Sequence, residues 1–229
     1  MALTGVAVAG TRLDVARRDV IHGDGVAWLE ASELGPEHAE VTSLPDRSEL
    51  EELSFEAWRA WFVDVAALVA EKVHPEAVAI FYQTDVKQDG RWIDKAHLVQ
   101  TGADRAGMHL LFHKVVCRAP PGRTTFGRPA FGHWLALSKE LRLPPSASTP
   151  DVLPELGTMT WSRAMPLSAA EGTCRFLRDH TGCRVIVDPF CGHGTILAAA
   201  NAHGMDAIGV ERSKKRVRKA RRLSFDDPV

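Results

Sequence analysis

The chain has 229 residues, of which 45% are hydrophobic, and a formal net charge of -1. This length and composition are ordinary for a globular protein with one substantial core, so we expect a single domain over residues 1–229. No window approaches the roughly 20 apolar residues of a membrane-spanning helix, which excludes a membrane protein of that kind.

The first segment, residues 1–19, carries only weak targeting signals. It has no basic stretch followed by an apolar core, so we expect no secretion and predict a cytoplasmic protein. Arg12, Arg17 and Arg18 stand among small residues, as in organelle transit segments, but Asp14 and Asp19 interrupt that pattern. Organelle import is therefore the alternative location.

The middle of the chain alternates helical and strand patterns. Apolar residues recur at helical spacing from residue 55 to residue 68, which predicts a helix, and residues 77–81 predict the next strand. Residues 113–117 and 133–139 read as the two strands of a hairpin. Residues 139–158 form a short loop rich in proline and serine, and residues 168–177 read as a helix.

The most informative stretch is DPFCGHGT, residues 188–195. It follows a β-branched run at 185–187 that is typical of a strand buried on both faces. Gly192 and Gly194 can take backbone conformations closed to other residues and let a ligand approach the main chain. Because Thr195 begins a run of helix formers, the sequence predicts a strand, a tight turn and a helix.

A second strand is predicted at residues 207–210, and it ends in Glu211 about twenty residues after the glycines, where an acid suits ribose hydroxyls. Taken alone, a G-x-G turn is a weak signal, because many α/β units carry one for packing reasons. The acids at Asp188 and Glu211 are what favour a nucleoside ligand over that packing interpretation.

The combination of DPF-x-G-x-GT before a helix and I-G-V-E before a basic helix resembles the S-adenosylmethionine site of class I methyltransferases, specifically those that modify amino groups of nucleic-acid bases. The resemblance implies that Asp188 lies near the methionine amino group, that Gly192 and Gly194 lie under the cofactor, and that Glu211 binds its ribose. The remaining residues that it implies at the cofactor are Asp24, Met165, Pro166, Pro189, Phe190 and Thr195.

The late position of this motif is similar to that in permuted amino-methyltransferases, where the catalytic strand precedes the cofactor strands. Residues 21–29 are similar to the family's I-x-G-D-x-x-x-x-L segment, and residues 162–167 to the segment before its glycine turn. The resemblance, which runs from about Val20 to Leu223, implies a doubly wound, Rossmann-like α/β sheet with circularly permuted motif order and an antiparallel hairpin at one edge.

The catalytic tetrapeptide of that family reads Asp/Asn/Ser-Pro-Pro-aromatic, and this chain departs from it. Ser43, Leu44, Pro45 and Asp46 stand at its place. Leu44 replaces the first proline, and Asp46 replaces the aromatic residue that stacks on the base. Two interpretations stay open: Asp46 accepts a proton or hydrogen bond from an exocyclic amine, or Pro45 and Asp46 only form a turn that caps a helix near residues 49–52.

Two further features are candidates for substrate contacts. Tyr82 is the only tyrosine and follows a strand, where α/β sheets bind ligands. Seven of the nine residues from 214 to 222 are positively charged, so phosphate contacts compete with a solvated helix face as the interpretation. The candidates in this helix are Lys214, Lys215, Arg218 and Arg222, and Arg118, Arg123 and Arg128 could extend the same surface.

Cysteine and histidine spacing argues against a metal site. The four cysteines form no C-x-x-C pair, and the histidines at 97, 109, 113 and 133 lack helical i, i+4 spacing. We therefore expect no metal and reduced, mostly buried thiols.

These observations favour an S-adenosylmethionine-dependent methyltransferase that acts on an amino group of a base in structured RNA, because residues 139–158 leave little room for a domain that reads a DNA groove. A protein partner could supply target recognition. The alternatives are a catalytically altered fold that serves as an RNA-binding or assembly factor, a DNA adenine or cytosine N-methyltransferase, and a small-molecule or protein methyltransferase.

Overall fold

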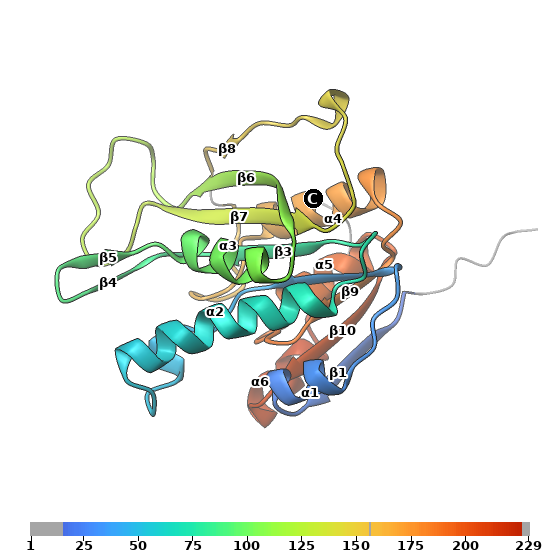
Figure 1. Cartoon of the computed structure of the whole chain (residues 1–229), viewed down its shortest axis with the longest axis horizontal. Coiled ribbons are helices and arrows are strands. Elements are labelled where there is room, and N and C mark those ends of the chain that lie inside the picture. Colours follow the sequence, from blue (N-terminus) through green and yellow to red (C-terminus); the bar gives the residue numbers. More distant parts are fainter. Residues whose placement is uncertain (1–15, 156, 226–229) are drawn as a thin grey trace, which may run out of the picture.

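The computed structural model describes residues 16–155 and 157–225, so Arg12 and Asp14 of the N-terminal segment lie outside the described residues. Strands and helices alternate along most of the chain (Figure 1). The strands are β1 (Arg18–His22), β2 (His38–Thr42), β3 (Ala79–Gln83), β4 (Val86–Gln88), β5 (Arg91–Ile93), β6 (His109–Cys117), β7 (Phe131–Ser138), β8 (Val152–Leu153), β9 (Val185–Asp188) and β10 (Asp206–Glu211). The α-helices are α1 (Gly25–Ala31), α2 (Phe55–Lys72), α3 (Lys95–Arg105), α4 (Leu167–His180), α5 (Thr195–Ala202) and α6 (Lys214–Ala220).

One sheet of eight strands organises the fold, in the order β1-β10-β9-β2-β3-β7-β6-β8. The first five of these strands are parallel, and β7 is antiparallel to both β3 and β6. Helices α1, α2 and α3 cover one face, and α4, α5 and α6 cover the other (Figure 1). The expected doubly wound sheet with an antiparallel hairpin near one edge is confirmed.

The permuted order is also present, because the central strand β9 comes late in the chain beside the early strand β2. From β9 the chain crosses through α5 to β10 on one side, and from β2 it crosses through α2 to β3 on the other. Neighbouring parallel strands whose connections diverge in this way leave a crevice at their carboxyl ends, which is where such sheets bind ligands. The topology therefore places the site at the ends of β9, β2, β10 and β3.

Sequence patterns missed several elements, among them β2, the β4–β5 hairpin and α3. Strand β2 was obscured by Glu40, a charged residue that is fully buried in the middle of the sheet. Burial, reinforced by the nearby Asp188 carboxylate, raises the pKa of Glu40 well above its usual value, so the neutral acid is the form that the core accommodates.

The N-terminal arginines that the structure describes belong to the fold. Arg18 donates from its guanidinium to Asn201 Oδ1 at 2.7 Å and to the carbonyl of Ala220 at 2.9 Å. All four cysteines are buried and unpaired. Among the described residues, no helix combines the length and apolar character needed to cross a membrane.

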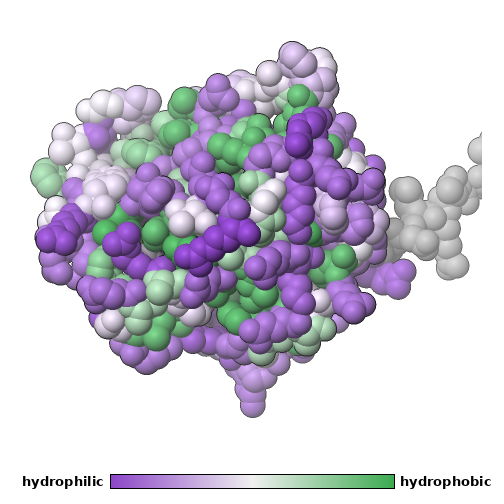
Figure 2. Space-filling view, viewed as in Figure 1, coloured by the Kyte–Doolittle hydropathy of each residue, from purple (hydrophilic) through white to green (hydrophobic). Residues whose placement is uncertain are grey.

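The outer face seen in Figure 2 mixes hydrophobic with hydrophilic residues, and no broad apolar band crosses it. Residues 139–151 contain a single 3-10 turn, Pro145–Ala147, before β8 pairs in parallel with β6.

Candidate functional site

A cavity of about 560 Å³ lies at the carboxyl ends of the parallel strands. It is lined by residues 24–26, 43–46, 82–84, 161–165, 188–192 and 210–213, with Lys95, Arg118, Arg128, Thr195 and Arg216 among the others. The fold thus brings the glycine turn, the altered tetrapeptide and the end of β3 to one cavity, although they are far apart in the sequence.

The glycine turn has the backbone geometry that its composition predicts. Gly192 and Gly194 have φ angles of 54° and 80°, values that side-chain-bearing residues rarely adopt. Only Gly192 lines the cavity. A Cβ atom at Gly194 would lie 2.9 Å from Cα and Cβ of Ala220, so Gly194 allows α6 to pack against the turn. We therefore revise the expectation that Gly194 lies under the cofactor.

Gly194→Val should destabilise the protein by roughly 2–4 kcal/mol, because the side chain would be strained at this φ and would collide with the backbone of Ala220. Urea unfolding measures this loss. The matched variant Gly204→Val shares a positive φ of 72° but has no atom within 4 Å of the added Cβ, so it should lose much less. Equal losses would contradict the packing role of Gly194.

Asp188 is a buried carboxyl group at the end of β9. One oxygen, Oδ1, accepts hydrogen bonds from Thr42 Oγ1 at 2.7 Å and from the Phe190 backbone N–H at 3.0 Å. Burial raises the pKa of Asp188 to about 7, against the effect of these hydrogen bonds, and the charge of Glu211 adds to the increase. Oδ2 has no hydrogen-bond donor among the described residues, so it is available to a cationic ligand in the cavity.

Glu211 ends β10 on the other side of the turn, as predicted. Its Oε1 accepts from the Ser213 backbone N–H at 2.6 Å, and its Oε2 lies 3.7 Å from Arg216 Nη1. Arg216 also pairs with Glu49 at 3.2 Å, and Arg163 pairs with Glu49 at 3.4 Å. These ion pairs tie α6 to the loop after β2, so they close this end of the cavity.

Asp24 and Gly25 explain the G-D-G stretch before α1. Asp24 lines the cavity and caps α1 by accepting from the Ala27 backbone N–H at 3.0 Å. A Cβ atom at Gly25 would lie 2.0 Å from the carbonyl oxygen of Pro189, so this glycine lets α1 approach the glycine turn. Met165 also lines the cavity, whereas Pro166 does not and instead stands at the N-cap of α4.

Ser43, Leu44, Pro45 and Asp46 all line the same cavity. Ser43 Oγ donates to the Tyr82 carbonyl at 2.6 Å, which leaves its lone pairs available to an incoming N–H. The Pro45 carbonyl accepts from Trp58 Nε1 at 3.2 Å. These two hydrogen bonds fix the main chain of the altered tetrapeptide against β3 and α2.

Asp46 forms an ion pair with Lys95, a residue that the sequence analysis missed. The Lys95 side chain is only 3% exposed and lies at the start of α3. Asp46 stands at the N-cap of the 3-10 turn Arg47–Glu49 but makes no side-chain capping hydrogen bond. The turn of that interpretation is present, since the Glu49 backbone N–H donates to the Asp46 carbonyl at 2.8 Å, but the Asp46 carboxylate is directed to Lys95 and not to the turn.

Gln83, next to Tyr82, supplies a buried polar group without a partner. The Tyr82 hydroxyl and the Gln83 Nε2 amide are both buried, and Gln83 Nε2 has no hydrogen-bond partner among the described residues, whereas the side chains of Arg118 and Thr84 interact with the Tyr82 hydroxyl. Burial raises the pKa of Tyr82, and the positive charge of Arg118 opposes the increase. Both residues line the cavity. Because an unsatisfied buried polar group costs about 1–3 kcal/mol, a ligand that pairs with the Gln83 amide would gain affinity.

The basic run divides into cations that bind other parts of the fold and cations that do not. Arg216 makes the ion pairs described above, and Arg221 donates to the Val20 carbonyl at 2.7 Å. The others form no ion pair with described residues and are exposed: Lys214, Lys215, Arg218, Lys219 and Arg222. All of these except Lys214 line a separate, shallow hollow together with His193. None of them reaches the main cavity.

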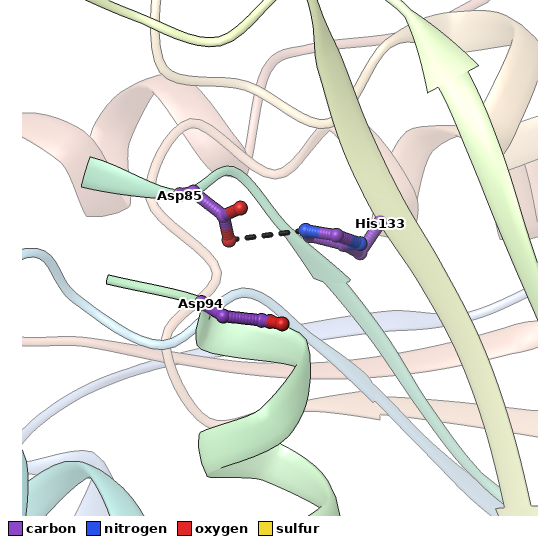
Figure 3. Close-up of side chains that lie close together, drawn as sticks. All are labelled: Asp85, Asp94 and His133. Carbon is purple, nitrogen blue, oxygen red and sulfur yellow. Dashed lines mark hydrogen bonds and ion pairs between the residues drawn. The ribbon is translucent and has the colours of Figure 1, made fainter. Parts of the chain in front are cut away.

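Figure 3 shows Asp85, Asp94 and His133, whose ligand atoms lie within 4.8 Å of one another. Asp85 Oδ1 is 3.0 Å from His133 Nε2 and accepts from the Lys95 backbone N–H at 2.9 Å, and Oδ2 accepts from Trp92 Nε1 at 2.8 Å. Asp94 Oδ1 caps α3 through the His97 N–H at 2.9 Å. Since hydrogen bonds already engage these ligand atoms, we assign the cluster a structural role, and the expected absence of a metal stays a prediction.

Comparisons with known proteins identify similar folds. No model of a protein family and no curated protein sequence matches the chain. A protein named as a candidate DNA modification methylase of Thermus thermophilus has a TM-score of 0.66 and 22% identity, over 90% of this chain and 93% of that one. PvuII DNA methyltransferase, described as cytosine-N4-specific, has a TM-score of 0.70 and 16% identity, over 93% of this chain and 88% of that one.

A third similar structure is that of M1.HpyAVI in complex with SAM, with a TM-score of 0.56 and 16% identity, over 89% of this chain and 97% of that one. The Thermus protein has also been solved with S-adenosyl-L-methionine, at 21% identity. At these identities the likeness establishes the fold.

Proposed function

We propose that this chain is an S-adenosylmethionine-dependent methyltransferase that acts on an exocyclic amino group of a nucleic-acid base. One observation carries the proposal: Asp188, Gly192 and Glu211 share a single cavity with Ser43 and its neighbours. A cofactor motif and an amine-orienting loop that meet in one cavity can hold two reactants in a reactive arrangement, which is the main source of catalysis in a direct transfer.

The chain's residues fit the proposed cofactor. When bound, S-adenosylmethionine supplies an electrophilic methyl group. Asp188 Oδ2 is available to its amino group and Glu211 Oε2 to its ribose hydroxyls, while the left-handed backbone at Gly192 leaves room for close approach. Trp161, which stacks on His193 with ring centroids 4.4 Å apart, contributes an aromatic wall to the same cavity.

On the target side, Ser43 and Asp46 are hydrogen-bond acceptors for an amino group. The Leu44 carbonyl accepts no hydrogen bond from the described residues, so it can hold the target amino group, which is the role that the resemblance implies for the carbonyl of the proline at this place. Paired with Lys95, the Asp46 carboxylate is better suited to orient an N–H than to take up a proton. We therefore propose that these three groups direct the nitrogen lone pair towards the cofactor side of the cavity.

We favour DNA as the nucleic acid and so depart from the expectation of RNA. Two of the three similar structures are named for DNA modification or methylation: the Thermus protein and PvuII DNA methyltransferase. The compact size does not count against DNA, because this chain covers 88% of the PvuII enzyme and 93% of the Thermus protein. An enzyme named for DNA methylation can thus consist of little more than this fold.

The test is methyl transfer from isotopically labelled S-adenosylmethionine to double-stranded DNA, single-stranded DNA and total RNA, followed by mass spectrometry of the nucleosides. Label in an N-methylated base of DNA supports the proposal. Label only in RNA would restore the RNA alternative, and transfer only to protein or small molecules would refute the nucleic-acid target. Cofactor binding without any transfer would favour the binding or assembly factor.

The exposed cations of α6 should bind phosphates. Replacing Lys214, Lys215, Arg218 and Arg222 with glutamine should weaken nucleic-acid binding and reduce the slope of log affinity against log salt by about 1 for each phosphate that is no longer neutralised. Arg175→Gln and Arg178→Gln on α4, whose side chains are 49% exposed, are matched controls. An unchanged slope in the α6 variant would place the phosphates elsewhere.

A further inference from the structure

Two projections leave the sheet at the edge that carries the cavity. The β4–β5 hairpin follows β3, and residues 118–130 connect β6 to β7. Because β3 and β7 are antiparallel, with Gln83 opposite His133, the exit from β3 and the entry to β7 lie side by side. The hairpin and the 118–130 loop therefore emerge together on the target side of the site (Figure 1).

These projections carry an excess of positive charge. Residues 86–93 and 118–130 together contain five cations and one acid, Asp89. The cations form no ion pair with any residue in the described part of the chain: Lys87, Arg91, Arg118, Arg123 and Arg128. Phe126 is 85% exposed and Trp92 is 47% exposed. We call these seven residues the rim surface.

Exposed aromatic rings beside unpaired cations are what a single-stranded nucleic acid requires. Its phosphates attract the cations, and its unpaired bases can stack on aromatic side chains. Lys87 Nζ lies 4.9 Å from the Trp92 ring centroid, which places a positive charge directly at one such ring.

Trp92 is held in position by a hydrogen bond from its indole N–H. Its indole N–H donates to Asp85 Oδ2 at 2.8 Å, and Asp85 is joined to His133 of β7 at 3.0 Å (Figure 3). His133 in turn lies 2.9 Å from His113 of β6. The base of the hairpin is thereby pinned to the two strands that carry the 118–130 loop, so the exposed half of the indole ring is presented in a fixed orientation.

The rim surface is continuous with the cavity, because two of its residues, Arg118 and Arg128, also line the cavity. The altered tetrapeptide, with Asp46 in place of an aromatic residue, provides no stacking ring of its own. We propose that the rim surface binds the unpaired strand that flanks the target nucleotide, with Phe126 and Trp92 stacking on its bases and the arginines contacting its phosphates. This inference rests on the proposed function and specifies how the substrate is held.

The test measures binding without cofactor, by fluorescence anisotropy of a labelled 12-nucleotide single-stranded DNA, the RNA of the same sequence, and the DNA duplex. Wild type should bind the single strands more tightly than the duplex. Phe126→Ala and Trp92→Ala should each weaken single-strand binding by about tenfold, since stacking on one base is worth about 1–3 kcal/mol. Arg123→Gln should weaken it less and flatten its salt dependence.

Controls keep the result specific to the rim surface. Leu110→Ala removes an apolar side chain that is 38% exposed at the start of β6, the end of that strand remote from the 118–130 loop, and Arg178→Gln removes an exposed cation of α4, so both should bind the single strands as wild type does. Trp92→Phe, which keeps a ring but loses the bond to Asp85, should fall between wild type and Trp92→Ala. Thermal unfolding confirms that the variants are folded.

Wild-type affinity in both Phe126→Ala and Trp92→Ala would overturn the inference, as would tighter binding of the duplex than of the single strands. These outcomes are separate from those of the proposed function. If the protein binds the cofactor and transfers methyl groups while the rim variants bind single strands as wild type does, only the inference about the rim surface is refuted. If single-strand binding depends on the rim surface but the protein transfers no methyl group, the proposed enzymatic activity is refuted and the inference about the rim surface stands.

Discussion

Asp46→Ala should lower methyl transfer by about a hundredfold while leaving cofactor affinity nearly unchanged. The carboxylate lines the target side of the cavity, and loss of an orienting group affects turnover more than cofactor binding. Single-turnover transfer and titration calorimetry measure the two quantities. Normal turnover in Asp46→Ala would mean that Asp46 has no part in the chemistry.

The same substitution should also destabilise the fold, because it leaves the buried Lys95 ammonium without its partner. Removing one member of a buried ion pair costs on the order of 3 kcal/mol, somewhat less here since the Asp46 side chain is 29% exposed. The double variant Asp46→Ala, Lys95→Met should recover much of this stability in urea unfolding but none of the turnover. That separation distinguishes a chemical role from a structural one.

Asp64→Ala is the matched control for this loss. Asp64 pairs with Arg105 at 2.8 Å, but the side chains are 67% and 55% exposed. An exposed ion pair of this kind contributes about 0–1 kcal/mol, so Asp64→Ala should change stability little and turnover not at all. An equal loss in both variants would show that burial of Lys95 is not what makes the Asp46 pair important.

Asp188→Asn should weaken S-adenosylmethionine binding by about a hundredfold, because the amide keeps the shape of the carboxyl group but cannot provide its charge. Truncating one member of a buried charge pair typically costs about 2–5 kcal/mol. Asparagine can still accept from Thr42 and Phe190, so the variant should fold. Calorimetry at pH 8 measures the loss, and wild-type affinity in the variant would refute the contact.

The pKa of Asp188, raised to about 7 by burial, gives this prediction a pH dependence. The folded state holds the proton more tightly than the unfolded state does, so stability conferred by the protonated group is lost as pH rises from about 4 to about 7. Relative to Asp188→Asn, wild type should lose unfolding free energy across that range and change little above it.

Cofactor affinity should respond in the opposite direction, because the ionised carboxylate is the form that pairs with an amino group. Wild-type affinity should rise as pH is raised from 6 towards 8, and binding at pH 6 should release a proton, seen as a dependence of the binding enthalpy on the buffer. Asp188→Asn should lack that proton release. Equal release in both proteins would assign it to another group.

Local signals in the sequence were sufficient for the segment around Asp188. The β-branched run before Asp188, the two glycines and the helix formers after them define a strand, a turn and a helix within about fifteen residues, and neighbours in sequence stay neighbours in space. The resemblance to permuted amino-methyltransferases, which depends on the order of the segments along the chain, implied the permuted, doubly wound sheet that the structure has.

The side-chain contacts within the site were decided by tertiary structure. Lys95 pairs with Asp46 across forty-nine positions, and Thr42 binds Asp188 across 146, so no sequence window contains either pair. The same reason explains why Gly194 does not line the cavity as expected: its environment is set by Ala220, which α6 brings back to the glycine turn.

Strand β2 was hidden for a different reason. Its central Glu40 reads as a surface residue, and only packing between β9 and β3 makes it a buried one. Composition and periodicity report what a segment prefers alone, whereas the burial of an ionisable side chain depends on which strands and helices the fold places around it.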